Sequence, residues 1–311
     1  MLRFLFKVYL LQIPTILRGG KKSMKGIILS GGTGSRLWPS TISTSKQLLP
    51  IFDKPMIYYP LTTLMTADIR EILIIVTPRD VEAFKSLLGD GTNFGLNLVF
   101  KVQDEPRGLA EAFIIGEEFI GKDSVALILG DNLFHGEAFG SELESIKEIS
   151  GARIFASHVK DPQRYGVISF DAQGNALLIE EKPKKPKSNY AIPGLYFFDN
   201  KVVGFAKNVE FSARQELEIT SVLNEYLLEK NLQVKVLPKG TAWLDTGTFE
   251  SLHDASSYVR VLEERQGYKM GCPEEEAFLR GWIDASKLRQ IITIYGNSPY
   301  GKYLESLLPT P

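Results

Sequence analysis

The stretch GIILSGGTGSRLWP, residues 26–39, decides the fold of this chain. Its first four residues form an apolar, β-favouring run that is typical of a buried strand. Gly31, Gly32 and Gly34 follow, and glycine lets a backbone turn sharply and approach a ligand closely. Successive backbone N–H groups in such a loop form a concavity that binds anions, and Arg36 adds a forked cation that suits phosphate oxygens. The stretch therefore predicts a strand that ends in a phosphate-binding loop.

The spacing of this stretch excludes two common phosphate-binding loops. The ATPase loop ends in Gly-Lys-Ser/Thr, and no such sequence follows Gly34. The dinucleotide fingerprint needs a third glycine at a spacing that this stretch lacks. The glycines alone are equally consistent with a plain turn between a strand and a helix. Arg36, and Lys46 in the KQLLP sequence of residues 46–50, favour the phosphate-binding interpretation.

The composition is that of an ordinary globular protein of 311 residues, long enough for one large or two modest domains. The net charge of −1 gives no sign of nucleic acid or an anionic membrane as a partner. The single cysteine, Cys272, excludes a disulfide within the chain and favours a reducing compartment, so we expect a cytoplasmic protein. The three histidines lie far apart in sequence, which argues against a zinc site.

Residues 1–23 differ from the rest of the chain because they carry five Lys or Arg residues and no acid. Their apolar run is too short to span a bilayer, and no small-x-small cleavage site precedes Lys21. A transit peptide is one interpretation. We favour an upstream extension outside the fold, with Met24 as the functional start, because Lys25 leads directly into the first strand.

Strand and helix patterns alternate through the first half of the chain, which predicts an α/β fold with a largely parallel sheet. Such sheets bind ligands beyond the carboxyl ends of their strands, where both the glycine loop and the Gly130-Asp-Asn132 turn fall. The expected strands cover residues 26–29, 72–76, 96–102, 125–129 and 153–159, and the expected helices cover residues 55–67, 80–88, 109–120 and 140–149.

The pattern changes after residue 159. Short strands separated by Gly, Asn and Pro turns are expected at residues 166–170, 177–180, 194–198 and 233–237, with helices at 202–207 and 218–229. We interpret this part as an insertion over a sugar site or an antiparallel edge of the sheet. From residue 248 the chain is mostly helical, with a break at 271–273. Its apolar residues predict either packing on the chain's own body or a subunit interface: Leu279, Trp282, Ile283, Leu288, Ile291 and Ile292.

Two aspartates follow expected strands and are candidate metal ligands. Asp131 follows the apolar run 125–129, and Asp245 lies in the AWLDTGT sequence of residues 242–248. Magnesium prefers one or two carboxylates together with substrate phosphates. Each aspartate alone is also typical of a helix cap or a turn, so the pair gains weight only from the surrounding motifs.

Several of these motifs together resemble the signatures of the sugar-1-phosphate nucleotidyltransferases. The resemblance rests on residues 26–39 with Lys46, on GDN at 130–132, on EEKP at 180–183 and on WLDTG at 243–247, and it extends from Met24 to near Leu308. It implies a Rossmann-like nucleotide-diphospho-sugar transferase fold: a mixed, mainly parallel central sheet with helices on both faces, a small antiparallel sugar-binding part and C-terminal helices. The implied domains are a catalytic domain of residues 24–250, divided near residue 160 into nucleotide and sugar parts, and a helical region of residues 251–311.

The implied activity is Mg²⁺-dependent transfer of a thymidylyl group from dTTP to glucose 1-phosphate, giving dTDP-glucose and pyrophosphate. This would be a first step towards dTDP-rhamnose or a related deoxysugar, carried out by a homotetramer with no nucleic acid or membrane partner. A uridylyltransferase that makes UDP-glucose and a noncatalytic nucleotide-sugar sensor are the alternatives. A nicotinamide dehydrogenase is disfavoured by the missing fingerprint.

The resemblance also implies roles for individual residues. Arg36, Lys46, Asp131, Lys182 and Asp245 would be catalytic, with Asp131 and Asp245 holding Mg²⁺. The nucleotide would be bound by Leu29, Gly31, Gly32, Thr33, Gly34, Ser35, Gln47, Gln103, Pro106 and Gly108, with Gln103 reading the base edge through its amide. The sugar would be bound by Asn132, Tyr165, Gly166, Glu181 and Ile192.

The chain departs from the family pattern at several positions near these residues. Ser30 replaces the usual alanine of the loop, Arg107 stands where the family usually has an acidic residue, and Glu111 stands where it usually has glutamine. No expected catalytic group is lost. Because Arg107 is close to the base-reading segment, the choice of nucleotide is the property most open to change.

Overall fold

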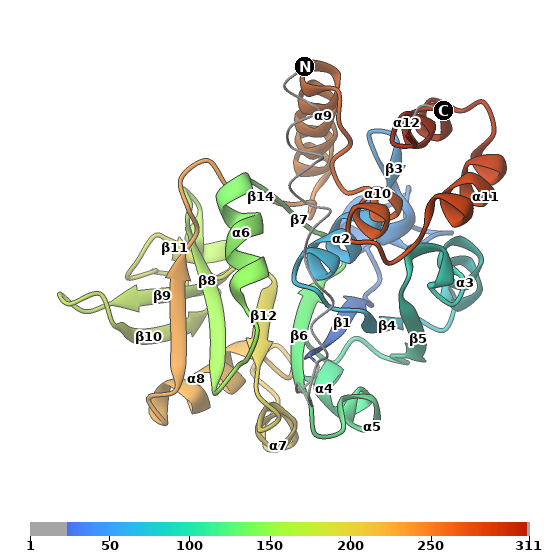
Figure 1. The fold of residues 1–311 in the computed structure, drawn as a ribbon. Helices are drawn as coiled ribbons and strands as arrows, with labels where there is room; N and C mark the ends of the chain where they lie inside the picture. Colours follow the sequence, from blue (N-terminus) through green and yellow to red (C-terminus); the bar gives the residue numbers. More distant parts are fainter. Residues whose placement is uncertain (1–23, 310–311) are drawn as a thin grey trace.

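The computed structural model describes residues 24–309, so the expected extension of residues 1–23 lies outside the described residues. A ten-stranded sheet forms the centre of the molecule (Figure 1), with the order β10-β9-β11-β8-β12-β6-β1-β4-β5 and β13 paired to β8. The strands of this sheet are β1 (Met24–Ser30), β4 (Glu71–Val76), β5 (Asn97–Val102), β6 (Ser124–Leu129), β8 (Ala152–His158), β9 (Gly166–Phe170), β10 (Ala176–Glu181), β11 (Tyr190–Ala191), β12 (Leu195–Phe198) and β13 (Leu232–Val236).

Helices cover this sheet and form the C-terminal region. They are α2 (Tyr58–Thr66), α3 (Val81–Leu88), α4 (Glu111–Ile115), α5 (Glu117–Ile120), α6 (Glu137–Ser145), α7 (Val202–Lys207), α8 (Ile219–Leu228), α9 (Phe249–Gln266), α10 (Pro273–Leu279), α11 (Ala285–Tyr295) and α12 (Pro299–Ser306). Among residues 24–309, no helix is long and apolar enough to cross a membrane.

Strands β6, β1, β4 and β5 are parallel, as the alternating pattern predicts. Successive residues of β1 point to opposite faces of the sheet, so Ile27 and Ile28 join two different hydrophobic clusters and both are fully buried. A parallel sheet that is covered on both faces needs such continuous apolar strands. The carboxyl ends of β1 and β6 are therefore held rigidly side by side.

The sheet becomes mixed beyond β6. Strand β12 runs antiparallel to both β6 and β8, and β13 is parallel to β8. Strands β9, β10 and β11 continue as antiparallel ladders. The expected mixed, mainly parallel sheet with a small antiparallel part is confirmed. The expected nucleotide part and the expected sugar part of the catalytic domain both contribute strands to this one sheet. The domain boundaries stay predictions.

Local expectations differ from the structure in a few places. The helix expected at residues 109–120 is divided into α4 and α5 at Gly116, where a Cβ atom would lie 2.9 Å from the Ala112 carbonyl oxygen and 3.0 Å from Ile27. The helix expected at 140–149 begins earlier, at Glu137, and ends at Ser145. Two small sheets were not foreseen as pairs: β2 (Pro50–Ile51) with β3 (Lys54–Pro55), and β7 (Asn132–His135) with β14 (Ala242–Asp245).

The C-terminal helices α10, α11 and α12 lie beside α2 at one side of the molecule (Figure 1). Ile283, Leu288 and Ile291 are buried in the same cluster as residues of α2 and β4, which supports packing on the chain's own body. Leu279 and Ile294 stay 59% and 72% exposed. The subunit-interface alternative for such side chains stays a prediction.

Candidate active site

The glycine loop after β1 has the backbone conformation that its sequence predicts. Gly32 and Gly34 have φ angles of 94° and 63°, in the left-handed region that glycine adopts most readily. The hydroxyl of buried Thr41 donates a hydrogen bond of 2.7 Å to the Gly34 carbonyl oxygen and fixes the end of the loop. Arg36 follows in a short helical turn, Ser35–Leu37, in which Arg36 is exposed and Leu37 is buried. Its guanidinium is therefore available to a ligand over the loop.

Two adjoining cavities lie at the carboxyl ends of the parallel strands. The loop cavity, of about 320 Å³, is lined by the glycine loop together with Lys46, Gln47 and Pro106. The Tyr165 cavity, of about 160 Å³, is lined by Tyr165, Glu181, Lys182 and residues of β14. Arg36, Asp131 and Gly247 line both cavities. A ligand in one cavity would therefore meet a ligand in the other at Arg36 and Asp131.

The small β7–β14 sheet brings the two candidate metal ligands together. Asp131 immediately precedes β7, and Asp245, the last residue of β14, pairs with Asn132 in the antiparallel register. The Thr246 hydroxyl donates a 3.0 Å hydrogen bond to the Asp131 carbonyl oxygen, which closes the ladder at this end. Two carboxylates that are far apart in sequence thus lie at one end of one pair of strands.

Asn132 holds this arrangement from inside. It is buried, and its amide nitrogen donates to Asp131 Oδ1 at 2.9 Å. Its amide oxygen accepts from the Gly194 backbone N–H at 3.0 Å and from the Trp243 indole N–H at 2.7 Å. Asn132 lines the Tyr165 cavity as expected of a sugar-binding residue. However, these internal contacts use both ends of its side-chain amide, so its evident effect is to orient Asp131.

Each candidate metal ligand carries a cationic partner. Lys46 Nζ lies 2.6 Å from Asp131 Oδ2, and Arg164 Nη2 lies 2.8 Å from Asp245 Oδ2. Burial alone would raise the pKa of Asp131, but the Lys46 ammonium and the hydrogen bond from Asn132 lower it below its usual value. Burial raises the pKa of Asp245, and the negative charge of Asp131 adds to this although Arg164 opposes it.

The walls of the Tyr165 cavity combine aromatic rings with carboxylates and with the cations Arg36, Arg164 and Lys182. The rings of Tyr165 and Trp243 lie 5.0 Å apart between centroids. Glu181 lies 3.7 Å from Lys182 Nζ and 3.5 Å from Arg214 Nη1. Burial and the nearby carboxylate of Glu218 raise the pKa of Glu181, while Lys182 and Arg214 oppose this. Such a mixture suits a ligand with hydroxyl groups and a phosphate.

Lys182 has a φ angle of 40°, which is unusual for a residue with a side chain. Its backbone N–H donates a 3.0 Å hydrogen bond to the Tyr165 carbonyl oxygen, so the strand pairing holds this conformation in place. Backbone strain of this kind is typical of functional positions. The backbone conformation at Lys182 therefore sets the direction of a side chain that the sequence predicts to be catalytic.

The structure brings most of the residues with predicted roles to these two cavities. The predicted residues that line the loop cavity are Gly31, Gly32, Thr33, Gly34, Ser35, Arg36, Lys46, Gln47, Pro106 and Asp131. Those that line the Tyr165 cavity are Arg36, Asp131, Asn132, Tyr165, Gly166, Glu181, Lys182, Ile192 and Asp245. Leu29, Gln103 and Gly108 line neither of these two cavities.

Sequence reasoning missed several cavity residues. Arg164 contacts Asp245, and Trp243 contacts Asn132. Trp243 belongs to the WLDTG motif, but no role was predicted for it. Arg164 lies in residues 161–166, a stretch that also matches the family pattern, but no role was assigned to it. The other unforeseen lining residues are Leu109, Leu129, Gly194, Tyr196, Ile219, Thr220, Leu223 and Gly247 in the Tyr165 cavity, and Leu37, Glu216 and Gly247 in the loop cavity.

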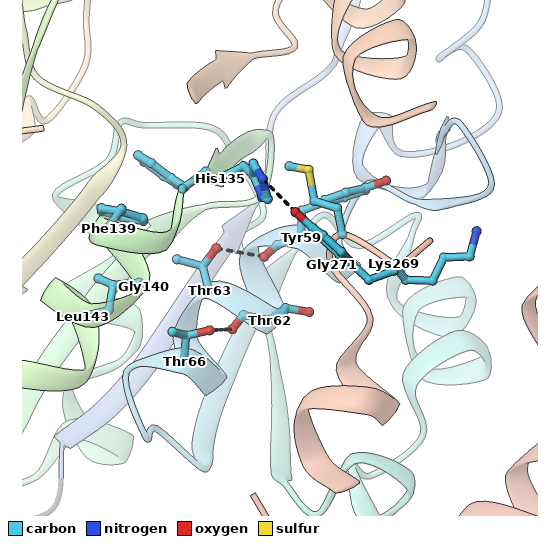
Figure 2. A pocket seen from close by; sticks show the side chains of 14 residues that line it. Tyr59, Thr62, Thr63, Thr66, His135, Phe139, Gly140, Leu143, Lys269 and Gly271 are labelled. Atoms are coloured by element: carbon cyan, nitrogen blue, oxygen red, sulfur yellow. Dashed lines mark hydrogen bonds between the residues drawn. The ribbon is translucent and has the colours of Figure 1, made fainter. Parts of the chain in front are cut away.

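A third cavity, of about 170 Å³, lies between α2, the start of α6 and the segment after α9 (Figure 2). Thr62, Thr63 and Thr66 line it from α2, and His135 lies opposite them. The hydroxyl of Tyr268 lies 3.4 Å from His135 Nε2 across one wall. This cavity contains none of the residues with predicted roles, so it is separate from the candidate active site.

Comparisons with known proteins agree with this geometry. The nucleotidyl transferase family profile matches residues 25–261. A glucose-1-phosphate thymidylyltransferase from Mycobacterium tuberculosis (strain CDC 1551 / Oshkosh) is 56% identical over 285 residues, which is 92% of this chain and 99% of the relative. The enzyme of that name from Neisseria meningitidis serogroup A is 51% identical over 286 residues, covering 92% of this chain and 99% of its own.

Solved structures show the same fold. A Bacillus anthracis structure with bound sucrose, described as a glucose-1-phosphate thymidylyltransferase, has a TM-score of 0.70 and 42% identity and covers 76% of this chain and 96% of its own. A UDP-glucose pyrophosphorylase in complex with UDP-glucose has a TM-score of 0.68 at 22% identity over 77% of this chain and 99% of its own, a likeness of fold alone. The family profile and the identity of the relatives, both extending over most of the chain, show that this protein belongs to the nucleotidyl transferase family.

Proposed function

We propose that this chain transfers a thymidylyl group from dTTP to glucose 1-phosphate, giving dTDP-glucose and releasing pyrophosphate. The single observation that carries the proposal is the meeting of two cavities at Arg36 and Asp131. One cavity is bounded by a phosphate-binding glycine loop, and the other by a carboxylate, hydroxyl groups and a lysine. Two phosphorylated substrates placed in them would have their phosphates side by side.

The reaction needs charge neutralisation more than proton transfer. The attacking group is a phosphate oxygen that is already an anion, so no general base is required. A nucleoside triphosphate carries roughly −4 and a sugar phosphate roughly −1.5 to −2. A divalent metal with Arg36, Lys46 and Lys182 would supply roughly +5. Holding two anions in line is then the main contribution of the protein.

We assign the metal to Asp131 and Asp245, and we propose that it is Mg²⁺. Among residues 24–309, no group of three His, Cys, Asp or Glu side chains gathers as a metal-binding cluster. Two carboxylates at one end of β7 and β14 match a metal that takes its remaining ligands from phosphates and water. When bound, the ion would polarise the phosphate oxygens and offset the charge that develops on them.

The chain's own residues take distinct parts in this proposal. The backbone of the glycine loop binds the triphosphate, and Arg36 reaches the phosphate groups where the two cavities meet. Lys46 orients Asp131 through their 2.6 Å ion pair and stays close to the reacting phosphates. Lys182 holds the phosphate of the sugar, and Glu181 accepts hydrogen bonds from sugar hydroxyls. Asp161, which lies 2.9 Å from Arg164 Nη1, steadies the guanidinium that faces Asp245.

The test measures pyrophosphate release with glucose 1-phosphate, Mg²⁺ and one nucleotide at a time. We expect turnover with dTTP and slower turnover with UTP, because the missing methyl group is worth only about 1–3 kcal/mol. Tight dTTP binding without pyrophosphate release would favour a noncatalytic sensor, and faster turnover with UTP would favour a uridylyltransferase. Omission of Mg²⁺ should abolish the signal.

Arg36→Ala provides the matched test of the site. We expect its kcat to fall far more than its KM rises. The reason is that the guanidinium stabilises the charge on the phosphates in the transition state more than it stabilises the bound substrates. Arg260→Ala is the control, since Arg260 is 54% exposed on α9 and outside both cavities. A loss confined to KM in Arg36→Ala would contradict the assigned role.

The remaining parts of the proposal rest on family resemblance. We propose a homotetramer in the cytoplasm whose product enters a route to dTDP-rhamnose or a related deoxysugar. Sedimentation velocity at several protein concentrations tests the tetramer, and a monomer at all concentrations would contradict it.

A further inference from the structure

Gln103 lies at the carboxyl end of β5, directly behind the glycine loop. Its side chain is buried, and its Oε1 atom lies where a side chain of Gly31 would be, 2.3 Å from an ideal Cβ. Gly31 and Pro106 line the loop cavity on this side. The Gln103 amide therefore lies directly behind Gly31, on the side of the loop cavity where we place the nucleotide base.

Glu111, at the start of α4, determines which end of that amide faces Gly31. The Gln103 amide nitrogen donates a 2.8 Å hydrogen bond to Glu111 Oε2. The other carboxylate oxygen, Oε1, accepts from Arg107 Nε at 2.7 Å and also from Arg107 Nη2. Glu111 is itself buried, whereas Arg107 is exposed. Both carboxylate oxygens thus have donors, and the charge of Glu111 has a partner.

This arrangement permits one orientation of the amide. An ionised carboxylate can only accept hydrogen bonds, so the group that faces it must be the NH₂ end of Gln103. The carbonyl end is then directed towards Gly31. A neutral glutamine at position 111 would accept either orientation, because its own amide has both a donor and an acceptor. The charge on Glu111 therefore changes an adaptable amide into a fixed hydrogen-bond acceptor.

We propose that Glu111, which forms an ion pair with Arg107, is a positioning residue that makes this site select bases with an N–H group at the recognised edge. Thymine and uracil have this group at N3, whereas cytosine has a lone pair there and would face Gln103 Oε1 acceptor to acceptor. The proposal rests on the proposed function, since it assigns the nucleotide to the loop cavity. The proposal predicts that dCTP is a poor substrate because its N3 lone pair would face another acceptor. It predicts no discrimination against UTP, which has an N3 hydrogen.

Glu111→Gln tests the proposal, because it replaces the carboxylate by a carboxamide with little change in side-chain volume. For the wild type we expect kcat/KM with dTTP to exceed that with dCTP by about a hundredfold or more. In Glu111→Gln the amide of Gln103 can turn over, so we expect this ratio to fall at least about tenfold, chiefly through a lower KM for dCTP. Glu105→Gln is the control, because Glu105 is exposed on the same segment. This variant should keep the wild-type ratio of kcat/KM with dTTP to kcat/KM with dCTP.

The ratio distinguishes orientation from general damage, which would slow both nucleotides together. A folded Glu111→Gln protein with the wild-type ratio would overturn the proposal. Should that variant fail to fold, 3-N-methyl-dTTP tests the recognition of the N3 hydrogen on which the proposal depends, because its methyl group replaces that hydrogen. We expect its binding, measured by calorimetry, to be at least about tenfold weaker than that of dTTP. Equal binding would overturn the proposal.

These binding measurements also separate the two proposals in this protein. If the wild type binds dTTP more tightly than dCTP, Glu111→Gln loses this preference and neither protein releases pyrophosphate, the proposed function fails while the role of Glu111 holds. If pyrophosphate is released equally fast from both nucleotides, the proposed reaction type holds and the role of Glu111 fails.

Discussion

Replacing Lys54 with methionine tests how the C-terminal half is attached to the strands next to the active site. Lys54 Nζ lies 2.6 Å from Asp53 Oδ1 and 2.7 Å from Glu263 Oε1. Lys269 Nζ lies 2.6 Å from Glu263 Oε2 and also contacts Asp53. These four side chains form a neutral quartet that joins the β2–β3 hairpin, α9 and the segment after α9. The side chains of Lys54 and Glu263 are only 2% and 4% exposed.

The expected magnitude follows from this burial. Lys54→Met keeps most of the side-chain volume but leaves the quartet with a net charge of −1, and Glu263 loses its partner in the nearly fully buried part of the quartet. Removing one partner of a buried ion pair costs about 3–5 kcal/mol, against about 0–1 kcal/mol for an exposed pair. At about 2 °C per kcal/mol for a chain of this size, Tm should fall by roughly 6–10 °C.

The assay is thermal and urea unfolding followed by circular dichroism. Lys85→Met is the matched control, because Lys85 forms an ion pair of 3.1 Å with Glu82 in which the side chains are 49% and 85% exposed. We expect that control to lose less than about 1 kcal/mol. The double variant Lys54→Met with Glu263→Gln should cost less than the sum of its single changes, because it removes opposite charges together. A cost below 1 kcal/mol for Lys54→Met, or full additivity, would refute the reasoning.

Four further outcomes follow from individual contacts. Ser30→Ala should raise the free energy of unfolding by about 1 kcal/mol, because the buried Ser30 hydroxyl has no hydrogen-bond partner among residues 24–309; a loss in urea unfolding would contradict this. Gly108→Ala should cost at least about 2 kcal/mol in the same assay, since Gly108 has a φ of 116° and a Cβ would lie 2.4 Å from the Leu217 carbonyl oxygen; a neutral effect would show that the backbone yields there. Burial raises the pKa of Glu275 to about 7, so the folded protein holds this proton more tightly than the unfolded chain, and stability should fall as pH rises from about 4.5 to about 7; Glu275→Gln should reduce that slope in Tm measured against pH, and an unchanged slope would exclude this group as its source. Asp131→Asn should lose Mg²⁺-dependent pyrophosphate release while keeping its fold by circular dichroism, and near-normal activity would contradict the metal assignment.

The sequence was sufficient where a function depends on one short segment. The glycine loop of residues 31–34 carries its conformation in its own composition, and the structure has it after a buried strand as expected. Asp131 and Asp245 were recognisable because each follows an apolar strand. Their approach was not predictable in this way, because it depends on the antiparallel pairing of β14 with β7 in a separate small sheet.

Contacts between distant segments could not be predicted in the same way. The pairing of Arg164 with Asp245 joins the turn before β9 to the end of β14, two segments 81 positions apart, and no local pattern sets it. The amide of Asn132 was expected to face a sugar, but the indole of Trp243 and the backbone of Gly194 occupy its oxygen. Arg107 and Glu111 were visible as two separate departures from a family pattern. Only the structure, in which Arg107 forms an ion pair with Glu111 at the start of α4, shows that they compensate each other in charge.

The β7–β14 ladder has a consequence for the order in which this protein becomes active during synthesis. Thr246, which closes the ladder on Asp131, follows it by 115 positions. Chains emerge from the ribosome amino terminus first, and their early parts begin to fold while later parts are still being made. The glycine loop, Lys46 and Asp131 are thus complete long before Asp245 exists. A nascent chain, or a fragment cut before β14, would have a place for a triphosphate but only one of the two carboxylates, so it could hold a nucleotide without consuming it.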